Sequence, residues 1–66
     1  MNIKIQVASV RDRKHLVAEL WVDDLQIAEV SREQGRFEVE MYTTGVPIPL
    51  EELQSALTSA QEELMK

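Results

Sequence analysis

The stretch LVAELWVDDLQIAEVS, residues 16–31, predicts the hairpin around which the rest of the fold is arranged. Two apolar runs flank the acidic pair Asp23 and Asp24, which is typical of a tight turn between the two strands of a hairpin. A two-residue turn at this pair would place Leu20 opposite Ile27. One face of the hairpin would then carry Leu16, Ala18, Leu20, Val22, Leu25 and Ile27. We expect this face to be the core of the sheet, because a slip of one residue would turn all of these side chains outward.

Two more strands flank this hairpin. The segment NIKIQVA, residues 2–8, alternates apolar and polar residues, and so does RFEVEMY, residues 36–42. Gly35 precedes the second segment, where a turn calls for a positive φ. The sequence therefore predicts strands over residues 2–8, 16–22, 25–31 and 36–42.

The length of the last hairpin loop decides which face the fourth strand presents. A loop of three or five residues ending at Gly35 puts Phe37, Val39 and Met41 on the core face. A loop of four residues puts them on the other face. We expect the first arrangement, because it gathers more apolar side chains in one place.

The C-terminal segment predicts a helix over residues 49–65. Pro49 suits its first turn, where a missing N–H costs nothing. One apolar stripe recurs at spacings of three and four residues: Leu50, Leu53, Leu57, Ala60 and Leu64. The predicted fold is thus α+β, a four-stranded antiparallel meander with one C-terminal helix packed on one face, in a single domain over residues 1–66.

Composition limits the classes of protein to which this chain can belong. It has 66 residues, a formal net charge of -5 and no cysteine, so disulfides and thiolate metal sites are excluded. The sequence contains no apolar run of membrane-spanning length and no signal peptide, so we expect a cytoplasmic protein without a cofactor. A core this small is marginal, and self-association is the remaining common source of stability.

The face opposite the predicted core carries the only Trp. We expect an apolar patch there that one helix cannot cover, and a patch of this kind usually marks a contact between proteins. Its residues are Val17, Trp21, Ala28, Val30 and Tyr42. The alternative is that the sheet twists and residues 43–48 fold over the patch, which would make Trp21 part of the core.

Basic residues gather in two turns that a meander places at the same end of the sheet. The candidates for contact with an anion are Arg11, Arg13, Lys14, Arg32 and Arg36. Acidic residues in the same turns and the absence of interleaved aromatic residues argue against nucleic acid. The alternative favoured here is that these cations lie near the C-terminal end of the helix and offset Glu62 and Glu63.

Residues suited to catalysis are sparse. His15 is the only histidine, and the sequence offers no second His or Cys at metal-ligand spacing. Glu38 and Glu40 share one side of a strand, but a carboxylate pair needs a cleft to do acid–base work. Two glycines do not make a phosphate-binding loop. We therefore expect a non-enzymatic protein with no small-molecule substrate.

The segments ASVRDRKHLVAELW, IAEVSREQGRFEVEMY and LEELQSAL together resemble a group of short bacterial proteins. Those proteins have a strand-rich front and one C-terminal helix, which agrees with the fold expected from the residues. The group has no known activity, so the resemblance implies no catalytic or binding residue.

The function expected from the sequence is a protein–protein interaction module that forms a homodimer through the face bearing Trp21, or binds another protein there. A second possibility is an acidic inhibitor, such as an immunity or anti-defence protein, that binds a basic target. Its candidate contacts would be Glu19, Asp23, Asp24, Glu29, Glu38 and Glu40. The two functions differ in salt dependence, because an acidic inhibitor loses affinity steeply as ionic strength rises.

Overall fold

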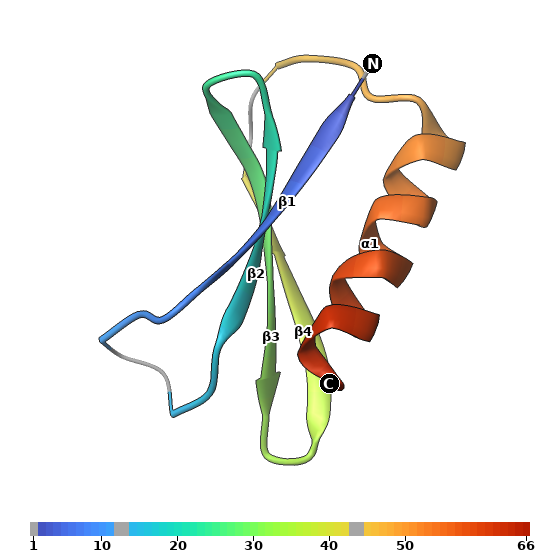
Figure 1. The fold of residues 1–66 in the computed structure, drawn as a ribbon. Helices are drawn as coiled ribbons and strands as arrows, with labels where there is room; N and C mark the ends of the chain where they lie inside the picture. The colour runs from blue at the N-terminus through green and yellow to red at the C-terminus, as the bar shows by residue number, and fades with distance from the viewer. Residues whose placement is uncertain (1, 12–13, 43–44) are drawn as a thin grey trace.

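The computed structural model describes residues 2–11, 14–42 and 45–66, which form four strands and one helix. The elements are β1 (Ile3–Ala8), β2 (Val17–Val22), β3 (Leu25–Glu33), β4 (Arg36–Met41) and α1 (Leu50–Leu64). The strands form one antiparallel sheet in the order β1-β2-β3-β4, and α1 lies across one face of it (Figure 1). The predicted α+β meander with a C-terminal helix is confirmed. We call the covered side of the sheet the helix face and the other side the outer face.

Both tight turns depend on positive backbone φ angles. Asp23 has φ 53°, which a short Asp side chain tolerates better than most. Gln34 and Gly35 have φ 52° and 79°, and two positive values in succession are what a type I′ hairpin turn requires. Since Glu33 pairs with Arg36, this turn has two residues. The predicted loop of three or five residues is therefore wrong.

A β-bulge in β3 changes the register expected for the first hairpin. Trp21 lies opposite Gln26, but Leu20 lies opposite Ala28, so Ile27 is an extra residue on β3. Beyond the bulge, alternation resumes one residue out of step with the prediction. The placement of Ala28 and Val30 on the outer face is therefore wrong, because the bulge turns both side chains to the helix face.

The two differences in register offset each other at β4. Val39 lies opposite Val30 and Met41 opposite Ala28, so the two-residue turn aligns β4 with the residues that the bulge has turned inward. Phe37, Val39 and Met41 consequently share the helix face with Leu20, as expected from the sequence. In the structure, a bulge in β3 and a two-residue turn place these side chains on the helix face. The prediction placed them there by a regular hairpin and a loop of three or five residues.

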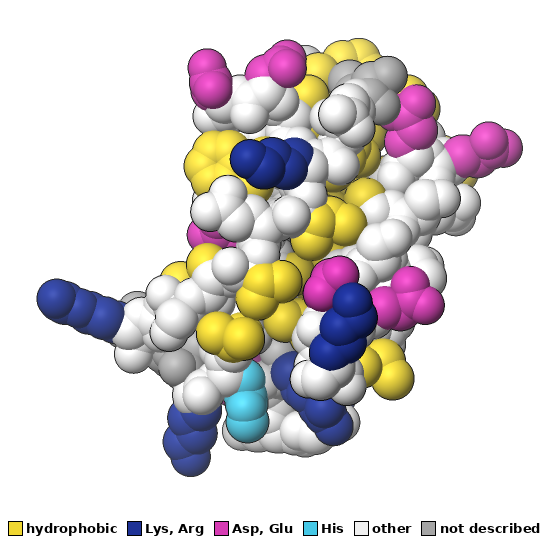
Figure 2. Space-filling model, in the orientation of Figure 1, with side chains coloured by type: hydrophobic (Ala, Val, Ile, Leu, Met, Phe, Trp, Pro, Cys, Tyr) yellow, Lys and Arg dark blue, Asp and Glu magenta, His cyan; other side chains and the backbone are white. Residues whose placement is uncertain are grey.

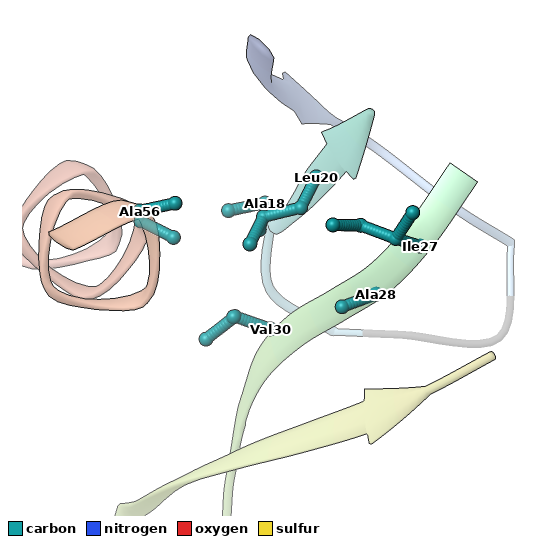
Figure 3. Close-up of a cluster of buried hydrophobic side chains, with 7 residues drawn as sticks. Ala18, Leu20, Ile27, Ala28, Val30 and Ala56 are labelled. Atoms are coloured by element: carbon teal, nitrogen blue, oxygen red, sulfur yellow. The ribbon is translucent and has the colours of Figure 1, made fainter. Parts of the chain in front are cut away.

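The core lies between the helix face and α1. Figure 3 shows Ala18, Leu20 and Val30 pointing toward α1, which carries Ala56. Ile3, Ile5, Phe37, Ile48, Leu53, Leu57 and Leu64 are among the partly buried side chains that pack around this cluster. The buried helix residues Ala56 and Ala60 are small, and small residues let a helix approach a sheet closely.

The helix matches its predicted stripe except at its first turn. Leu50 is 67% exposed and Ala56 takes its place among the buried residues. Pro49 precedes α1, and its carbonyl accepts a hydrogen bond from the Leu53 N–H at 3.0 Å. From there α1 runs back to the end of the sheet that holds the β3–β4 turn (Figure 1).

Replacing Gln34 by Asn is expected to stabilise the protein by about 0.5–1 kcal/mol, because Asn tolerates the left-handed region better than Gln and Asn-Gly is a favoured type I′ pair. Urea denaturation followed by circular dichroism measures the gain. Gln6→Asn, at an exposed position within β1, is the matched control and should show none. A loss of stability in Gln34→Asn would contradict the assigned turn.

Candidate interaction surface

Most of the residues predicted to form a patch around Trp21 are buried in the structure. Ala28 is fully buried and Val30 is 4% exposed, and both belong to the cluster beneath α1. Val17, opposite Ala8, lies on the outer face but is also fully buried. The expected apolar patch on the outer face is therefore wrong in composition, because its members Ala28 and Val30 belong to the core.

The two aromatic members of that set remain partly accessible, and Trp21 has polar neighbours. Trp21 is half-buried, and its indole Nε1–H donates to Glu19 Oε1 at 3.2 Å. Across the strands it lies beside Lys4 and Gln26. Tyr42 is 37% exposed and follows β4, where its N–H donates to the Ile27 carbonyl.

The outer face is dominated by carboxylates. Glu19 lies opposite Glu29, and Glu29 lies opposite Glu40, so three glutamates form a row across β2, β3 and β4. Like charges opposite each other repel. Glu38 forms an ion pair with Arg36, with 3.0 Å between Arg36 Nη2 and Glu38 Oε2. These carboxylates were candidate contacts of the acidic inhibitor, and the strand register aligns three of them.

The most exposed apolar segment of the sheet lies on β4. Val39 is 47% exposed and Met41 is 49% exposed, although both are on the helix face. The reason is the position of α1, which packs mainly on β1, β2 and β3. We call Phe37, Val39 and Met41 the β4 strip.

A shallow groove separates the β4 strip from the helix. It has a volume of about 170 Å³ and is lined by Val30, Phe37, Glu38, Val39, Leu57 and Gln61. The Arg32 guanidinium lies 5.3 Å from the centre of the Phe37 ring and covers one end of the strip by a cation–π contact. The groove and the strip together form an apolar surface that continues to the edge of the sheet.

β4 is an edge strand, so one side of its backbone has no neighbouring strand among the described residues. The hydrogen bond from Tyr42 to Ile27 identifies the residues of β4 whose backbone faces β3, because antiparallel strands alternate hydrogen-bonded and non-hydrogen-bonded pairs. Every second residue counted back from Tyr42 therefore has backbone N–H and C=O groups that face β3. These residues are Glu40, Glu38 and Arg36. The N–H and C=O groups of the β4 strip therefore point away from the sheet.

The basic residues lie chiefly at the opposite end of the sheet from Asp23 and Asp24, as predicted. Figure 2 shows most Lys and Arg side chains at the lower end, together with the single His. A hollow of about 430 Å³ at this end is lined by His15, Leu16, Arg32, Gly35, Glu63, Leu64 and Lys66. An anion entering the hollow would meet the Glu63 carboxylate, whose Oε1 lies 3.2 Å from Lys66 Nζ.

The predicted anion-contact residues are only partly brought together. Arg32 lines the hollow, whereas Arg36 is on the outer face and paired with Glu38. Arg11 and Lys14 are exposed, and Arg13 lies outside the described residues. Arg32 and Glu63 line the same hollow, but the ion pair of Glu63 is with Lys66, so the interpretation that the basic turns offset Glu62 and Glu63 stays a prediction.

Comparison with known proteins yields no family model, curated protein or solved structure that matches this chain. Within residues 2–11, 14–42 and 45–66, no helix is long and apolar enough to cross a membrane. The same ranges contain no group of three or more His, Cys, Asp or Glu residues placed to hold a metal ion.

The open side of β4 was missed by sequence reasoning. Alternation in RFEVEMY places Phe37, Val39 and Met41 on the helix face but does not say where the helix lies on it. One signal was available: a helix packs on a sheet with about 10 Å between centres, and four strands at roughly 4.8 Å spacing are wider than one helix covers. One edge of the helix face must then remain open.

Proposed function

We propose that this protein is a non-catalytic protein–protein interaction module that self-associates, and that the open side of the sheet at β4 carries the contact. The observation that supports the proposal is the combination of a free backbone edge with the exposed Val39 and Met41. A small domain gains stability by burying such surface against a second copy. The cytoplasm is the proposed location, because a chain without cysteine suits a reducing compartment.

The outer face around Trp21 is a weaker candidate for the contact. Its strand neighbours are Lys4 and Gln26, and the indole N–H already donates to Glu19. Interface centres are depleted in charged residues. The β4 strip fits that description better than the surroundings of Trp21.

Sedimentation equilibrium over a range of protein concentrations tests the proposal. The native chain is expected to dimerise, and Val39→Asp is expected to weaken the dimer by at least roughly tenfold, since it places a charge in the contact. Trp21→Glu, on the outer face, is the matched control and should dimerise like the native chain. A chain that is monomeric at every concentration would contradict self-association, and a dimer lost only in Trp21→Glu would move the contact to the outer face.

A second candidate function is the acidic inhibitor that presents carboxylates to a basic target. The row Glu19, Glu29 and Glu40 favours it, because aligned carboxylates concentrate negative potential on one face. Such a protein would be monomeric alone, and its affinity for the target would fall steeply between about 0.05 and 0.5 M salt. Salt should not dissociate the proposed homodimer, since it also screens the repulsion between two chains that each carry a net charge of -5.

A further inference from the structure

We infer that two copies of the chain join edge to edge, β4 against β4, in one antiparallel register in which Glu38 lies opposite Glu38 of the second copy. This inference rests on the proposed self-association and specifies its geometry. The two four-stranded sheets would become one continuous sheet, with both helices on the same face.

The free backbone groups of β4 limit the possible registers. The N–H and C=O groups of Phe37, Val39 and Met41 point toward the open edge, so a second strand must bond to these residues. A two-fold axis perpendicular to the sheet keeps the helix face on one side, and residues directly opposite each other then come from the same face. The pairing must therefore be centred on a residue that lies opposite its own copy.

Two registers overlap over five residues of β4 and so use the strand best. One is centred on Glu38 and pairs Phe37 with Val39 of the second copy. The other is centred on Val39 and pairs Phe37 with Met41 of the second copy. Both align residues of the β4 strip, so the apolar contacts alone do not choose between them.

The charges on the outer face select the register centred on Glu38. In that register Arg36 lies opposite Glu40 of the second copy, and the symmetry repeats this pair. In the register centred on Val39, Glu38 lies opposite Glu40 of the second copy, again twice. Opposite charges across strands stabilise a sheet and like charges destabilise it. The first register has two attractive Arg36–Glu40 pairs and one repulsive Glu38–Glu38 pair, whereas the second has two repulsive Glu38–Glu40 pairs, so the first register is favoured.

In this register the second copy supplies a cation that can pair with the Glu40 carboxylate. It stands at the end of the row with Glu29, and it forms no ion pair with any residue in the described part of the chain. Arg36 is 74% exposed and already contacts Glu38 of its own strand. The Arg36 guanidinium has several N–H donors, so it can bind Glu38 of its own strand and, at the same time, Glu40 of the second copy.

The other edge of the sheet is less suited to such pairing. The helix face of β1 packs against α1, and its groove is bordered by Glu51 and Glu52. The outer face of β1 carries Lys4, and lysine is one of the devices by which proteins protect an edge strand. The sequence of β4, RFEVEM, contains neither Lys nor Pro.

Single-cysteine variants test the register directly, because the native chain has no cysteine. Glu38 and its copy would form a non-hydrogen-bonded pair with Cα atoms about 4.5 Å apart, which lies within the range of disulfides. In a glutathione redox buffer, Glu38→Cys is expected to become a covalent dimer. Glu40→Cys, on the same strand and face, is the matched control. Its thiol should stay reduced, and no covalent dimer should accumulate.

The outcomes separate this inference from the proposed function. A covalent dimer formed only in a mixture of Glu38→Cys and Glu40→Cys would overturn the register in favour of the one centred on Val39. A native dimer by sedimentation with no disulfide in either variant or the mixture would overturn β4 pairing while leaving self-association intact. A monomeric native chain would overturn both.

A charge exchange gives an independent test of the selecting pair. Arg36→Glu would place six carboxylates around the axis, three from each β4, and is expected to raise the dimer dissociation constant roughly tenfold. Adding Glu40→Arg to that variant restores opposite charges across the two strands and should recover most of the loss. If the double variant dimerised no better than Arg36→Glu alone, Arg36 and Glu40 would not lie opposite each other.

Discussion

Replacing Val30 by Glu is expected to unfold the protein at room temperature. Val30 is 4% exposed and packs beneath α1, so the variant would bury a carboxylate among apolar side chains. The cost of burying an unpaired charge is on the order of 4 kcal/mol or more, which is comparable with the whole stability of a domain of this size. Far-ultraviolet circular dichroism and a thermal melt measure the loss.

Trp21→Glu is the control for this prediction. A regular hairpin without the bulge would place Val30 and Trp21 on the same face, so the two variants would then behave alike. With the bulge at Ile27, Val30 faces the helix while the half-buried Trp21 faces outward. Trp21→Glu should therefore remain folded, and a folded Val30→Glu variant would contradict the register.

The second large effect is expected for Leu20→Ala, with a loss of about 2–5 kcal/mol in the free energy of unfolding. Leu20 is one of the largest fully buried side chains and belongs to the cluster between the sheet and α1. Truncation removes its buried apolar surface and leaves a cavity. Urea denaturation gives the change in stability.

Leu50→Ala is the matched control, since Leu50 belongs to the predicted apolar stripe but is 67% exposed. We expect its free energy of unfolding to change by less than about 0.5 kcal/mol, as for an ordinary surface position. Equal losses in the two variants would show that the first turn of α1 is packed and that the position assigned to the helix is wrong.

The elements of the fold could be predicted from the sequence because each has a strong local pattern. Alternation in the first and last strands, the acidic pair between two apolar runs, and the stripe of α1 all depend on residues close in the chain. Element bounds differ only slightly: β3 extends to Glu33 and β4 ends at Met41, compared with predicted ends at residues 31 and 42.

The register could not be predicted because it depends on single residues that leave little trace. Ile27 and Ala28 are neighbouring apolar residues, and either one could have faced the core of a regular strand. The structure buries both by placing Ile27 in a bulge. The two-residue turn puts Gln34 at a positive φ, for which Gln carries no favourable signal.

The prediction of the patch around Trp21 depended on the predicted register, so the error in the register made the patch wrong as well. The patch predicted around Trp21 needed Ala28 and Val30 on the outer face, and the bulge removed both. The basic end was predicted more successfully, since its position follows from the order of the strands. The open side of β4 required knowledge of where α1 lies, which depends on packing between segments far apart in the chain.

Amide hydrogen exchange of β4, measured by NMR at two protein concentrations, tests the proposed contact most directly. Pairing through β4 predicts that the amides of Phe37 and Val39 exchange slowly when the protein is concentrated and fast when it is diluted, because these amides point away from β3 toward the second copy. The amides of Glu38 and Glu40 are bonded to β3 and should stay protected at both concentrations. Fast exchange of Phe37 and Val39 in a sample that sedimentation shows to be dimeric would contradict pairing through β4.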